Sequence, residues 1–589
     1  MKEKKILLSI ISLFETLDFI RKTQIILLLL TNIFNGFLEF LTLASAGIFL
    51  ESISDPEFQI QKYSIINSFL INNKNQVIVT SFIFIFFIAL SSGMRIFNLW
   101  FGMKFRISLL IYIEEKVFKN IINQNFKYHV NHSSTEIITN LTKNIDKTGF
   151  FIENLLSLIT SIILSLSLIF ALLRLSFFIT ILTVILLSFL YLLVGILTNK
   201  KVDKYSKFEL IATSNFLNII QESIGSIKEI ILKSNQEYYQ QRFKKESYIT
   251  RKYQGLNAFI TTFPKYLFEG LGIIVISLAG LITFSYKGGN IIPLLGTFAL
   301  GAQKLLPSLN TIYRSWSLLF FYNRGLNKIN QLLKLKYFKK ENFKEFKSNI
   351  FKKDITIKNL SYSINENENI LNNINLKISK GESIGIIGKT GSGKTTLINL
   401  LMGLLEPTEG NIYVDDKDIF NVDNKKILFK WRSLIDYIPQ KIFLINSTIE
   451  SNIAFCVNPQ LINTKKLNTA IDQACLNDFV NSKKNQTKDF VGEDGIKISG
   501  GQKQRIGIAR TIYNDLDILI MDESTSALDS FTEEKVIKNI HNKRKTKTII
   551  TIAHKLKTLI NCDKIIELEK GKIKSIITNK ELKLKLEEQ

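Results

Sequence analysis

The sequence predicts two joined parts, an α-helical membrane domain with six spans and, after it, a soluble α/β domain. Three observations predict this division. Six apolar runs precede residue 322, each near or above the ~20 residues that a helix needs to cross a bilayer. From about residue 350, short apolar strands alternate with helical segments, which is the pattern of an α/β domain. Within that second part, residues 388–395 form a glycine-rich octapeptide between an expected strand and an expected helix.

Composition narrows the class of protein. The 589 residues are 46% hydrophobic, and 76 Lys and Arg against 51 Asp and Glu give a net charge of +25. Such a charge is typical either of nucleic-acid binding or of the basic cytoplasmic faces of a membrane protein, and the apolar runs favour the membrane. The three cysteines all lie in the second part, and this odd number indicates free thiols rather than a disulfide scaffold.

The first part begins with a short basic segment, residues 1–22. The apolar run after it is too long for a signal peptide, so we interpret it as a retained membrane anchor. The alternative, buried helices of a soluble protein, fails on length and apolarity, since residues 77–90 have only Thr80 and Ser81 as polar side chains. The predicted spans are residues 23–50, 77–101, 151–173, 177–197, 258–284 and 291–321.

The loops predict the orientation. Eleven Lys and Arg residues lie between spans four and five, whereas the loops after spans one, three and five carry four in total. Because Lys and Arg are retained on the cytoplasmic side, both termini and the two long loops are expected there. We expect these loops to continue the spans as helices and to turn near residues 128–134 and 222–228. A Lys- and Glu-rich connector at 331–349 then separates a membrane domain at 1–330 from a soluble domain at 350–589.

The octapeptide fits G-x-x-x-x-G-K-[ST], the phosphate-binding loop of nucleotide hydrolases. It follows a short apolar strand at 383–387 and precedes a helix expected at 396–405. Glycines allow consecutive N–H groups to converge on phosphate oxygens, a lysine adds a mobile positive charge, and a Thr hydroxyl is a ligand for Mg²⁺. The residues predicted to hold the nucleotide are Gly388, Lys389, Thr390, Gly391, Ser392, Gly393, Lys394, Thr395 and Thr396, with Thr395 as the metal ligand.

Two acids follow an apolar strand expected at 518–521. Asp522, at the strand's C-terminal tip, is placed to hold Mg²⁺ through water, and Glu523 is placed to orient and polarise the attacking water. The alternative is a helix N-cap with a first-turn acid, because Ser524 and Thr525 come next.

A second phosphate-binding surface is predicted at residues 499–505, Ser-Gly-Gly-Gln-Lys-Gln-Arg, which precede and open a helix expected at 504–513. One γ-phosphate does not need two such surfaces. We therefore expect a dimer in which each subunit closes this surface on the other subunit's nucleotide. The contacting residues would be Ser499, Gly500, Gly501 and Gln502.

This segment resembles the signature of ATP-binding-cassette (ABC) proteins, and the other cassette motifs are present in order. Gln440 ends Tyr-Ile-Pro-Gln, residues 526–529 read Ser-Ala-Leu-Asp, and His554 ends Thr-Ile-Ala-His. The resemblance implies ATP and Mg²⁺ as ligands and ATP hydrolysis as the reaction. It also implies that Gln440 contacts Mg²⁺, that Asp529 contacts the partner subunit and that His554 holds the γ-phosphate.

Two further positions bear on the resemblance. Residues 491–495 are similar to the segment before the signature in exporter-type cassettes, where the acid, here Glu493, touches the membrane domain. Exporter cassettes usually stack adenine on an aromatic residue, but Ile364 stands at that position, with Tyr362 two residues earlier. The sequence therefore does not predict which residue stacks on adenine.

Six spans followed by one cassette resemble an ABC exporter half-transporter of type IV architecture, over essentially the whole chain. The resemblance implies a domain-swapped homodimer with two equivalent ATP sites and alternating access to the two sides of the membrane. It places the chain in a bacterial inner membrane with the cassette in the cytoplasm. A heterodimer is the alternative.

Ionisable residues inside spans are candidates for substrate binding. Arg95, Lys265 and Lys304 are expected to form a basic belt facing the inner leaflet, suited to a phosphate or pyrophosphate headgroup. The alternative is that Arg95 snorkels to the interface and that Lys265 pairs with Glu269 one turn along its helix.

Segments at 37–42, 263–270 and 304–310 resemble bacterial lipid-linked oligosaccharide flippases, with Lys at two positions where Arg is expected. The resemblance implies outward flipping of a polyprenyl-pyrophosphate-linked oligosaccharide, with membrane lipids and a second copy of the chain as partners and no nucleic acid. A general lipid or multidrug exporter is the alternative. A peptide exporter with its own protease is disfavoured, because the segment before span one has no Cys or His.

Overall fold

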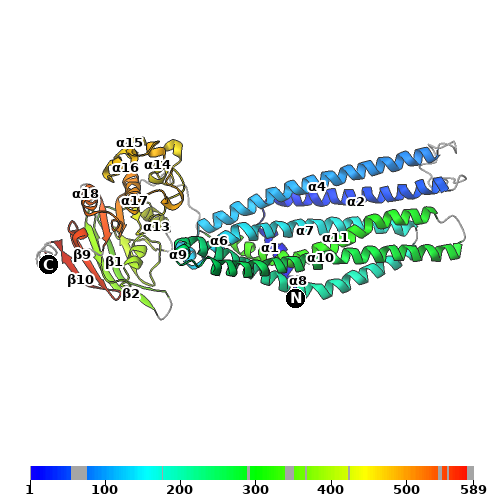
Figure 1. Ribbon diagram of the computed structural model, residues 1–589, viewed down its shortest axis with the longest axis horizontal. Helices are drawn as coiled ribbons and strands as arrows, with labels where there is room; N and C mark the ends of the chain where they lie inside the picture. The colour runs from blue at the N-terminus through cyan, green and yellow to red at the C-terminus, as the bar shows by residue number, and fades with distance from the viewer. Residues whose placement is uncertain are drawn as a thin grey trace. The chain divides into compact units, whose positions relative to one another are not determined.

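The computed structural model describes residues 2–54, 76–175, 177–287, 292–337, 350–364, 368–421, 425–541, 547–553, 556–579 and 581. The chain divides into two compact units. The membrane unit comprises Met1–Gln124 and Tyr128–Phe338, and the cassette unit comprises Asn125–Lys127 and Lys339–Gln589. Figure 1 shows long helices in the first unit and sheets flanked by shorter helices in the second.

Helices make up the N-terminal part of the chain, and the six longest contain between 31 and 52 residues. The helices are α1 (Lys2–Thr16), α2 (Phe19–Ser54), α4 (Gln76–Ile122), α5 (Phe126–Asn131), α6 (Ser134–Thr139), the π-helical turn η3 (Asn140–Asn144), α7 (Ile145–Leu175), α8 (Phe177–Gly225), α9 (Ile227–Leu232), α10 (Gln236–Lys287) and α11 (Ile292–Leu333).

Each predicted span lies in one of the long helices, apart from residue 291, which is outside the described residues. The turns expected at the loop tips are confirmed, because α4 is followed by the short helices α5 and α6, and α8 ends at Gly225 before α9. Residues 55–75, between the first two spans, and most of the connector lie outside the described residues.

Hydropathy distinguishes two groups among these helices. Within the described residues, four helical segments are long and apolar enough to cross a membrane, namely Phe19–Ser54, Val77–Ile122, Ser134–Arg174 and Thr180–Gly225. α10 and α11 are not in this group; α10 carries Lys265 and Glu269 within its apolar half, and α11 carries Lys304 and Arg314. Spans five and six therefore stay predictions.

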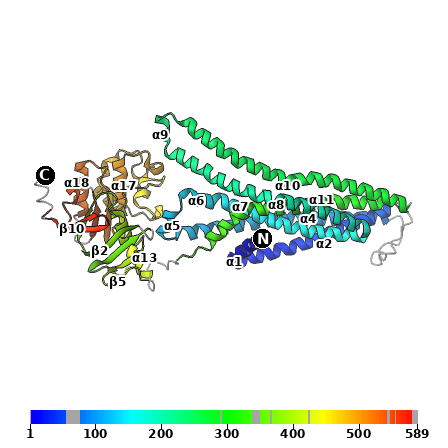
Figure 2. The same ribbon diagram turned by 90° about the horizontal axis from the view of Figure 1, so that it is seen from below.

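The long helices pack in pairs. α7 lies against α11, α8 against α10, and α2 against α4; Figure 2 shows α8 and α10 running side by side to α9. Small residues permit close contacts, as is usual between membrane helices. A Cβ on Gly36 of α2 would lie 2.7 Å from the Ser167 hydroxyl of α7, and one on Gly301 of α11 would lie 2.8 Å from the Leu172 side chain of α7.

The cassette unit contains two sheets. The first is antiparallel with strand order β2-β1-β4-β5, and the second has the order β10-β9-β3-β8-β7-β6, in which β9, β3, β8, β7 and β6 are parallel. The strands are β1 (Asp354–Ser363), β2 (Asn369–Ser379), β3 (Ser383–Ile387), β4 (Glu409–Val414), β5 (Lys417–Asp418), β6 (Ile435–Ile438), β7 (Ile518–Asp522), β8 (Thr548–Ile552), β9 (Lys564–Glu569) and β10 (Lys572–Thr578).

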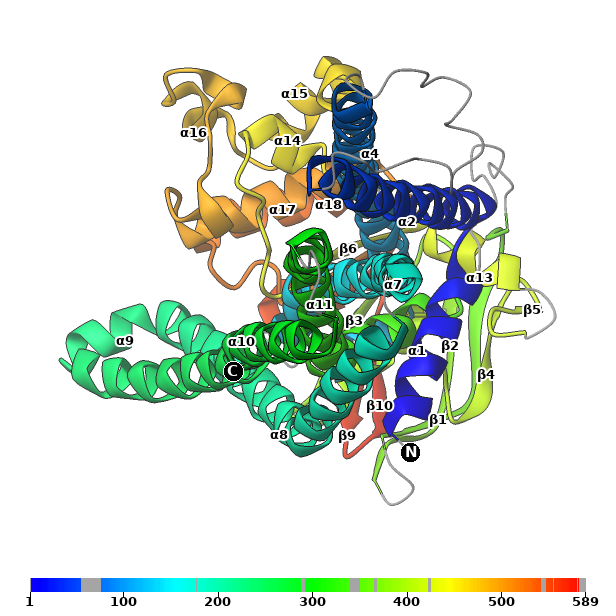
Figure 3. The ribbon, with the colours of Figure 1, turned by 90° about the vertical axis from the view of Figure 1, so that its right-hand side faces the viewer.

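Helices pack on these sheets around two hydrophobic clusters. One cluster joins both sheets through Leu397 of α12 and Trp431 of α13. The other lies between α14–α17 and strands β6, β7 and β8, and Figure 3 shows α14, α15 and α16 grouped away from β1 and β2. The helices are α12 (Lys394–Leu401), α13 (Lys425–Arg432), α14 (Ile449–Ile453), η6 (Pro459–Leu461), α15 (Thr464–Gln473), α16 (Asn477–Asn481), η7 (Gln486–Lys488), η8 (Glu493–Gly495), α17 (Gly500–Asn514), α18 (Ser530–His541) and η9 (Leu556–Leu559).

The observed elements correct two predicted boundaries. The strand expected at 383–387 is β3, but the helix expected at 396–405 is α12, which begins at Lys394 and ends at Leu401. The helix expected at 504–513 begins at Gly500. Both helices start inside their motifs because the capping residues, Gly393 and Ser499, belong to the motifs themselves.

Candidate functional site

The phosphate-binding loop has a backbone that only glycine adopts easily. Gly391 and Gly393 have φ angles of 80° and 98°, in the left-handed region that disfavours other residues. A Cβ on Gly393 would lie 2.7 Å from the Leu371 side chain, and one on Gly388 would lie 2.3 Å from the Leu568 carbonyl oxygen. The loop therefore packs closely against its neighbours, and a side chain at Gly388 or Gly393 would force the loop backbone to move.

The side chains of the loop fit a phosphate ligand. Lys394 is buried, and its Nζ donates to the carbonyl oxygens of Gly388 at 2.7 Å and Lys389 at 3.2 Å. Ser392 is also buried, and its hydroxyl has no hydrogen-bond partner among the described residues. An orphaned buried hydroxyl is costly, and phosphate oxygens would satisfy it. Thr395 is exposed in the first turn of α12, where its hydroxyl can reach a metal ion.

The two acids lie at the same edge of the sheet as the loop. β3, β8 and β7 are parallel neighbours, so their C-terminal ends meet there. Asp522 ends β7 and is buried; this burial and the adjacent charge of Glu523 raise the pKa of its carboxyl above the ordinary value. The Tyr437 hydroxyl donates to Asp522 at 3.3 Å. The carboxyl is thus held in position by a neutral partner.

Gln440 and Glu523, which the sequence predicts to act in one site, are in contact in the structure. The Gln440 Nε2 donates to the Glu523 Oε2 at 2.6 Å. Glu523 has a φ of 48°, and such strain at a non-glycine residue is frequent at functional sites. His554, expected to hold the γ-phosphate, lies outside the described residues, so its role stays a prediction.

The signature segment is ordered by a capping box. The Ser499 hydroxyl accepts from the Gln502 N–H, and the Gln502 side chain accepts from the Ser499 N–H, at the start of α17. Gln504 then links this helix to the next motif, because its side chain donates to the Ser526 hydroxyl at 3.2 Å and accepts from the Ala527 N–H at 2.9 Å. The exposed N-terminus of α17 carries a partial positive charge, so binding of an anion there is favourable.

Asp529 caps the next helix, α18. Its carboxylate accepts from the Thr532 N–H at 2.9 Å, and this hydrogen bond holds the pKa of Asp529 below its usual range. Asp529 is exposed, as the contact predicted with a partner subunit requires. Glu493 is also exposed, in η8.

Neither residue considered for adenine stacking takes a position typical of a base platform. Ile364 is 56% exposed just after β1, whereas Tyr362 is half-buried and packs against the first hydrophobic cluster. The tyrosine therefore contributes to the core, whereas the isoleucine presents an exposed apolar side chain.

In the membrane unit, three helices meet at one buried carboxylate. Glu39 of α2 has no exposed side-chain surface, and it pairs with Arg95 of α4 and with Lys304 of α11, whose Nζ lies 2.8 Å from the carboxylate. The Ser91 hydroxyl donates to the same carboxylate. We call these four residues the Glu39 centre.

Of the three residues predicted to form the basic belt, Arg95 and Lys304 belong to the Glu39 centre and Lys265 does not. Lys265 instead lies 3.9 Å from Glu269, one turn along α10, with both side chains more than two-fifths exposed. Sequence reasoning did not assign Glu39 to the site. A single acid in an otherwise apolar span was the available signal, because such a group requires a positive partner.

Comparisons with known proteins agree with both units. A family model described as "ABC transporter transmembrane region" matches residues 23–294, and one described as "ABC transporter" matches residues 371–526. A solved structure of a bacterial Atm1-family ABC exporter with ATP bound has the same fold, with a TM-score of 0.78 at 18% identity over 96% of each chain.

Relatives of several kinds share parts of this sequence. The heterocyst differentiation ATP-binding protein HepA of Nostoc sp. is 29% identical over 502 residues, 82% of this chain and 79% of the relative. An ATP-dependent lipid A-core flippase of Cupriavidus metallidurans is 39% identical over 204 residues, 34% of each protein. The alpha-hemolysin translocation ATP-binding protein HlyB of Escherichia coli is 40% identical over 230 residues, which cover 39% of this chain and 32% of that relative.

Proposed function

The chain is an ABC exporter half-transporter, and we propose which cargo it exports. The family follows from the presence of an ABC transporter transmembrane region and an ABC transporter ATP-binding domain on one polypeptide. Its transport is driven by hydrolysis of ATP, bound with Mg²⁺. The proposed cargo is a polyprenyl-pyrophosphate-linked oligosaccharide, flipped from the cytoplasmic to the outer leaflet of a bacterial inner membrane. The cassette would lie in the cytoplasm, and a second copy of the chain would complete the transporter.

The Glu39 centre is the observation that carries the choice of cargo. Arg95 and Lys304 supply two positive charges to a single carboxylate, so the centre has a net charge of +1. The Arg95 side chain is 47% exposed although the carboxylate is fully buried. An uncompensated positive charge within a membrane span is expensive and is usually functional. A phosphate or pyrophosphate group on a lipid would supply the missing negative charge.

Lipid cargo also agrees with the relatives, among which are ATP-dependent lipid A-core flippases. A general lipid or multidrug exporter is the second candidate. It would be favoured if the cations of the Glu39 centre proved dispensable, because a hydrophobic dye needs no anion site.

In the cassette, the residues have separable tasks in hydrolysis. Lys394 would exchange its contacts with the loop carbonyls for contacts with phosphate oxygens. Thr395 and Asp522 would hold Mg²⁺, and Glu523 would position the attacking water. Gln440, which donates to Glu523, would keep that carboxylate aimed at the water.

Transport in proteoliposomes tests the cargo. Full-length protein would be offered a short-chain polyprenyl-pyrophosphate oligosaccharide, a fluorescent phospholipid and a hydrophobic dye in the same vesicles. We expect ATP-dependent loss of the oligosaccharide from the leaflet that faces the cassette, and at least a tenfold lower rate for Arg95→Gln and Lys304→Gln, because each removes a charge-assisted contact.

Arg174→Gln is the matched control, since Arg174 at the end of α7 lies over the Phe170 ring and forms no ion pair with an acid among the described residues. Lys265→Gln tests whether the belt extends to α10. Movement of the dye or the phospholipid in place of the oligosaccharide would overturn the cargo assignment and leave ATP-driven export intact.

A further inference from the structure

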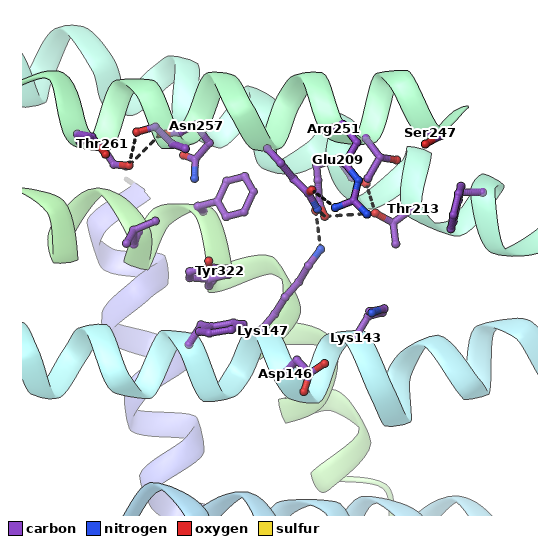
Figure 4. Close-up of a pocket in the computed structure, with 18 of the residues that line it drawn as sticks. Lys143, Asp146, Lys147, Glu209, Thr213, Ser247, Arg251, Asn257, Thr261 and Tyr322 are labelled. Atoms are coloured by element: carbon purple, nitrogen blue, oxygen red, sulfur yellow. Dashed lines mark hydrogen bonds and ion pairs between the residues drawn. The ribbon is translucent and has the colours of Figure 1, made fainter. Parts of the chain in front are cut away.

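A cavity lined by both charged and apolar side chains lies in the membrane unit, and none of its lining residues belongs to the Glu39 centre. It has a volume of about 510 Å³, within the range of small-molecule sites. Its lining residues come from η3, α7, α8, α10 and α11, and Figure 4 shows Lys147 reaching across to Glu209. Arg314 and Tyr322 line it from α11, ten and eighteen residues beyond Lys304, which corresponds to roughly 15–27 Å along the helix.

The cavity carries an excess of positive charge. Four cations and two acids line it: Lys143, Lys147, Arg251 and Arg314 against Asp146 and Glu209. Glu209 is already satisfied, because Lys147 pairs with it at 2.5 Å, and the Thr213 hydroxyl and the Gln254 amide donate to it at 3.2 and 3.3 Å.

Three of the cations are not neutralised within the described residues. Arg251 donates to the neutral Gln254 side chain at 3.0 Å. Lys143 and Arg314 form no ion pair with any acid in the part of the chain that the structure describes. Even with Asp146 counted, the lining has a net charge of +2, so it favours an anion.

Two buried oxygens in the lining have no partner. The Thr250 hydroxyl and the Asn257 amide oxygen make no hydrogen bond among the described residues, although Thr250 is only 8% exposed and Asn257 only 5%. Both residues line the cavity from α10, and Figure 4 labels Asn257 there. Buried acceptors without partners are unfavourable, so a ligand that donates O–H or N–H groups would relieve them.

Aromatic rings complete the wall. Phe150 of α7 and Tyr322 of α11 stack with their centroids 5.4 Å apart at an interplanar angle of 26°, and both line the cavity. The site therefore combines free cations, unsatisfied hydrogen-bond acceptors and an apolar ring surface. A purely hydrophobic molecule would leave the first two unmatched, and inorganic phosphate would leave the ring surface uncovered.

We infer that this cavity is a second ligand site that binds an anionic, hydroxyl-bearing group of the size of a sugar phosphate. Arg314, Lys143 and Arg251 would contact the anionic part, and Asn257 and Thr250 would accept hydrogen bonds from hydroxyl groups. The site goes beyond the proposed cargo centre, because it has its own lining residues. Its ligand has two conceivable sources, a free sugar phosphate or the saccharide end of a lipid-linked molecule.

Calorimetric titration of the full-length protein in lipid nanodiscs tests the site, with hexose 1-phosphate as the probe. We expect saturable binding of the hexose phosphate. Binding of the free hexose, which lacks the anionic group, and of inorganic phosphate, which lacks the sugar ring, should each be at least about tenfold weaker. Arg314→Gln should weaken binding of the hexose phosphate by about tenfold or more. Lys252→Gln is the matched control, because Lys252 adjoins Arg251 on α10 but does not line the cavity.

A second variant keeps the test informative if Arg314→Gln does not fold. Asn257→Asp keeps the size and the acceptor but adds a negative charge, so it should also weaken binding of the hexose phosphate about tenfold. Unaltered binding in both Arg314→Gln and Asn257→Asp, or no saturable binding of the hexose phosphate, would overturn the inference.

Competition separates the two sources of ligand. Displacement of hexose phosphate by a polyprenyl-pyrophosphate oligosaccharide in the nanodisc would assign the site to the saccharide end of a lipid-linked molecule. Binding without such displacement would assign it to a free sugar phosphate. Because binding is measured without ATP, failure of oligosaccharide transport would count against the proposed function alone.

Discussion

Asp522 and Glu523 are adjacent in the sequence but have different surroundings. Asp522 is buried at the end of β7, beside the Tyr437 hydroxyl, whereas Glu523 is half-buried and accepts a hydrogen bond from Gln440. Burial and the neighbouring charge raise the pKa of Asp522, and a bound divalent cation would reverse that effect. These different surroundings fit the roles proposed for the pair, with Asp522 holding the metal ion and Glu523 positioning the attacking water.

At the residue scale, we predict that Glu523→Gln stops turnover without preventing nucleotide binding. An amide cannot accept the proton of the attacking water, so steady-state ATP hydrolysis should fall by about 10²-fold or more, while ATP and Mg²⁺ remain bound. A phosphate-release assay and filter retention of labelled ATP measure the two effects. Glu534→Gln, at an exposed position of α18, is the control. Full hydrolysis by the Glu523 variant would refute its assigned role.

At the element scale, the Glu39 centre holds α2, α4 and α11 together. The three helices contribute residues 39, 95 and 304, and the carboxylate is the group that both cations share. Removing one member of a buried ion pair usually costs more than the pair contributes, because the remaining charge loses its compensation.

We therefore predict that Glu39→Leu lowers the free energy of unfolding by roughly 3 kcal/mol. Thermal unfolding in detergent micelles would measure the loss. Glu269→Leu is the matched control, since Glu269 is 41% exposed and lies 3.9 Å from Lys265, and exposed pairs contribute about 1 kcal/mol or less. The double variant Glu39→Leu with Lys304→Leu should recover part of the stability. Equal losses for Glu39→Leu and Glu269→Leu would contradict a structural role for the centre.

At the scale of the whole molecule, the cassette carries the two surfaces that are predicted to bind phosphate. One is the loop before α12, and the other is the capped start of α17, which Gln504 joins to residues 526 and 527. If each ATP site combines the loop of one subunit with the signature of another, activity depends on an assembled dimer.

Complementation tests this composite site. Chains with Lys394→Ala and chains with Ser499→Arg should each be inactive alone, because each homodimer has two damaged sites. Co-assembled from differently tagged copies, they should regain hydrolysis, since one site then has an intact loop and an intact signature. The expected rate is up to about half that of the wild type if the two sites act independently. No recovery in purified mixed dimers would indicate that each chain completes its own site.

The sequence by itself determined which elements of the cassette carry the nucleotide motifs. The phosphate-binding loop, β7 with its two acids and the capped signature helix depend on short stretches of neighbouring residues, so local periodicity and spacing predicted them. The two helix starts, at Lys394 and Gly500, were placed too late because the capping residues belong to the motifs, and the end of α12 was placed four residues too far along the chain.

Only the tertiary structure decided which charged side chains of the membrane helices pair with one another. Residues 39, 95 and 304 come from three different helices, and the cavity near Arg314 is lined by residues of η3 and of four long helices. Helical periodicity predicts which face a residue occupies, but it does not predict which face of another helix lies opposite. For this reason the pairing of Glu39 with Arg95 and Lys304 and the cavity near Arg314 became evident only once the helices were packed. The pairing of Lys265 with Glu269, one turn apart on a single helix, was already an alternative in the sequence.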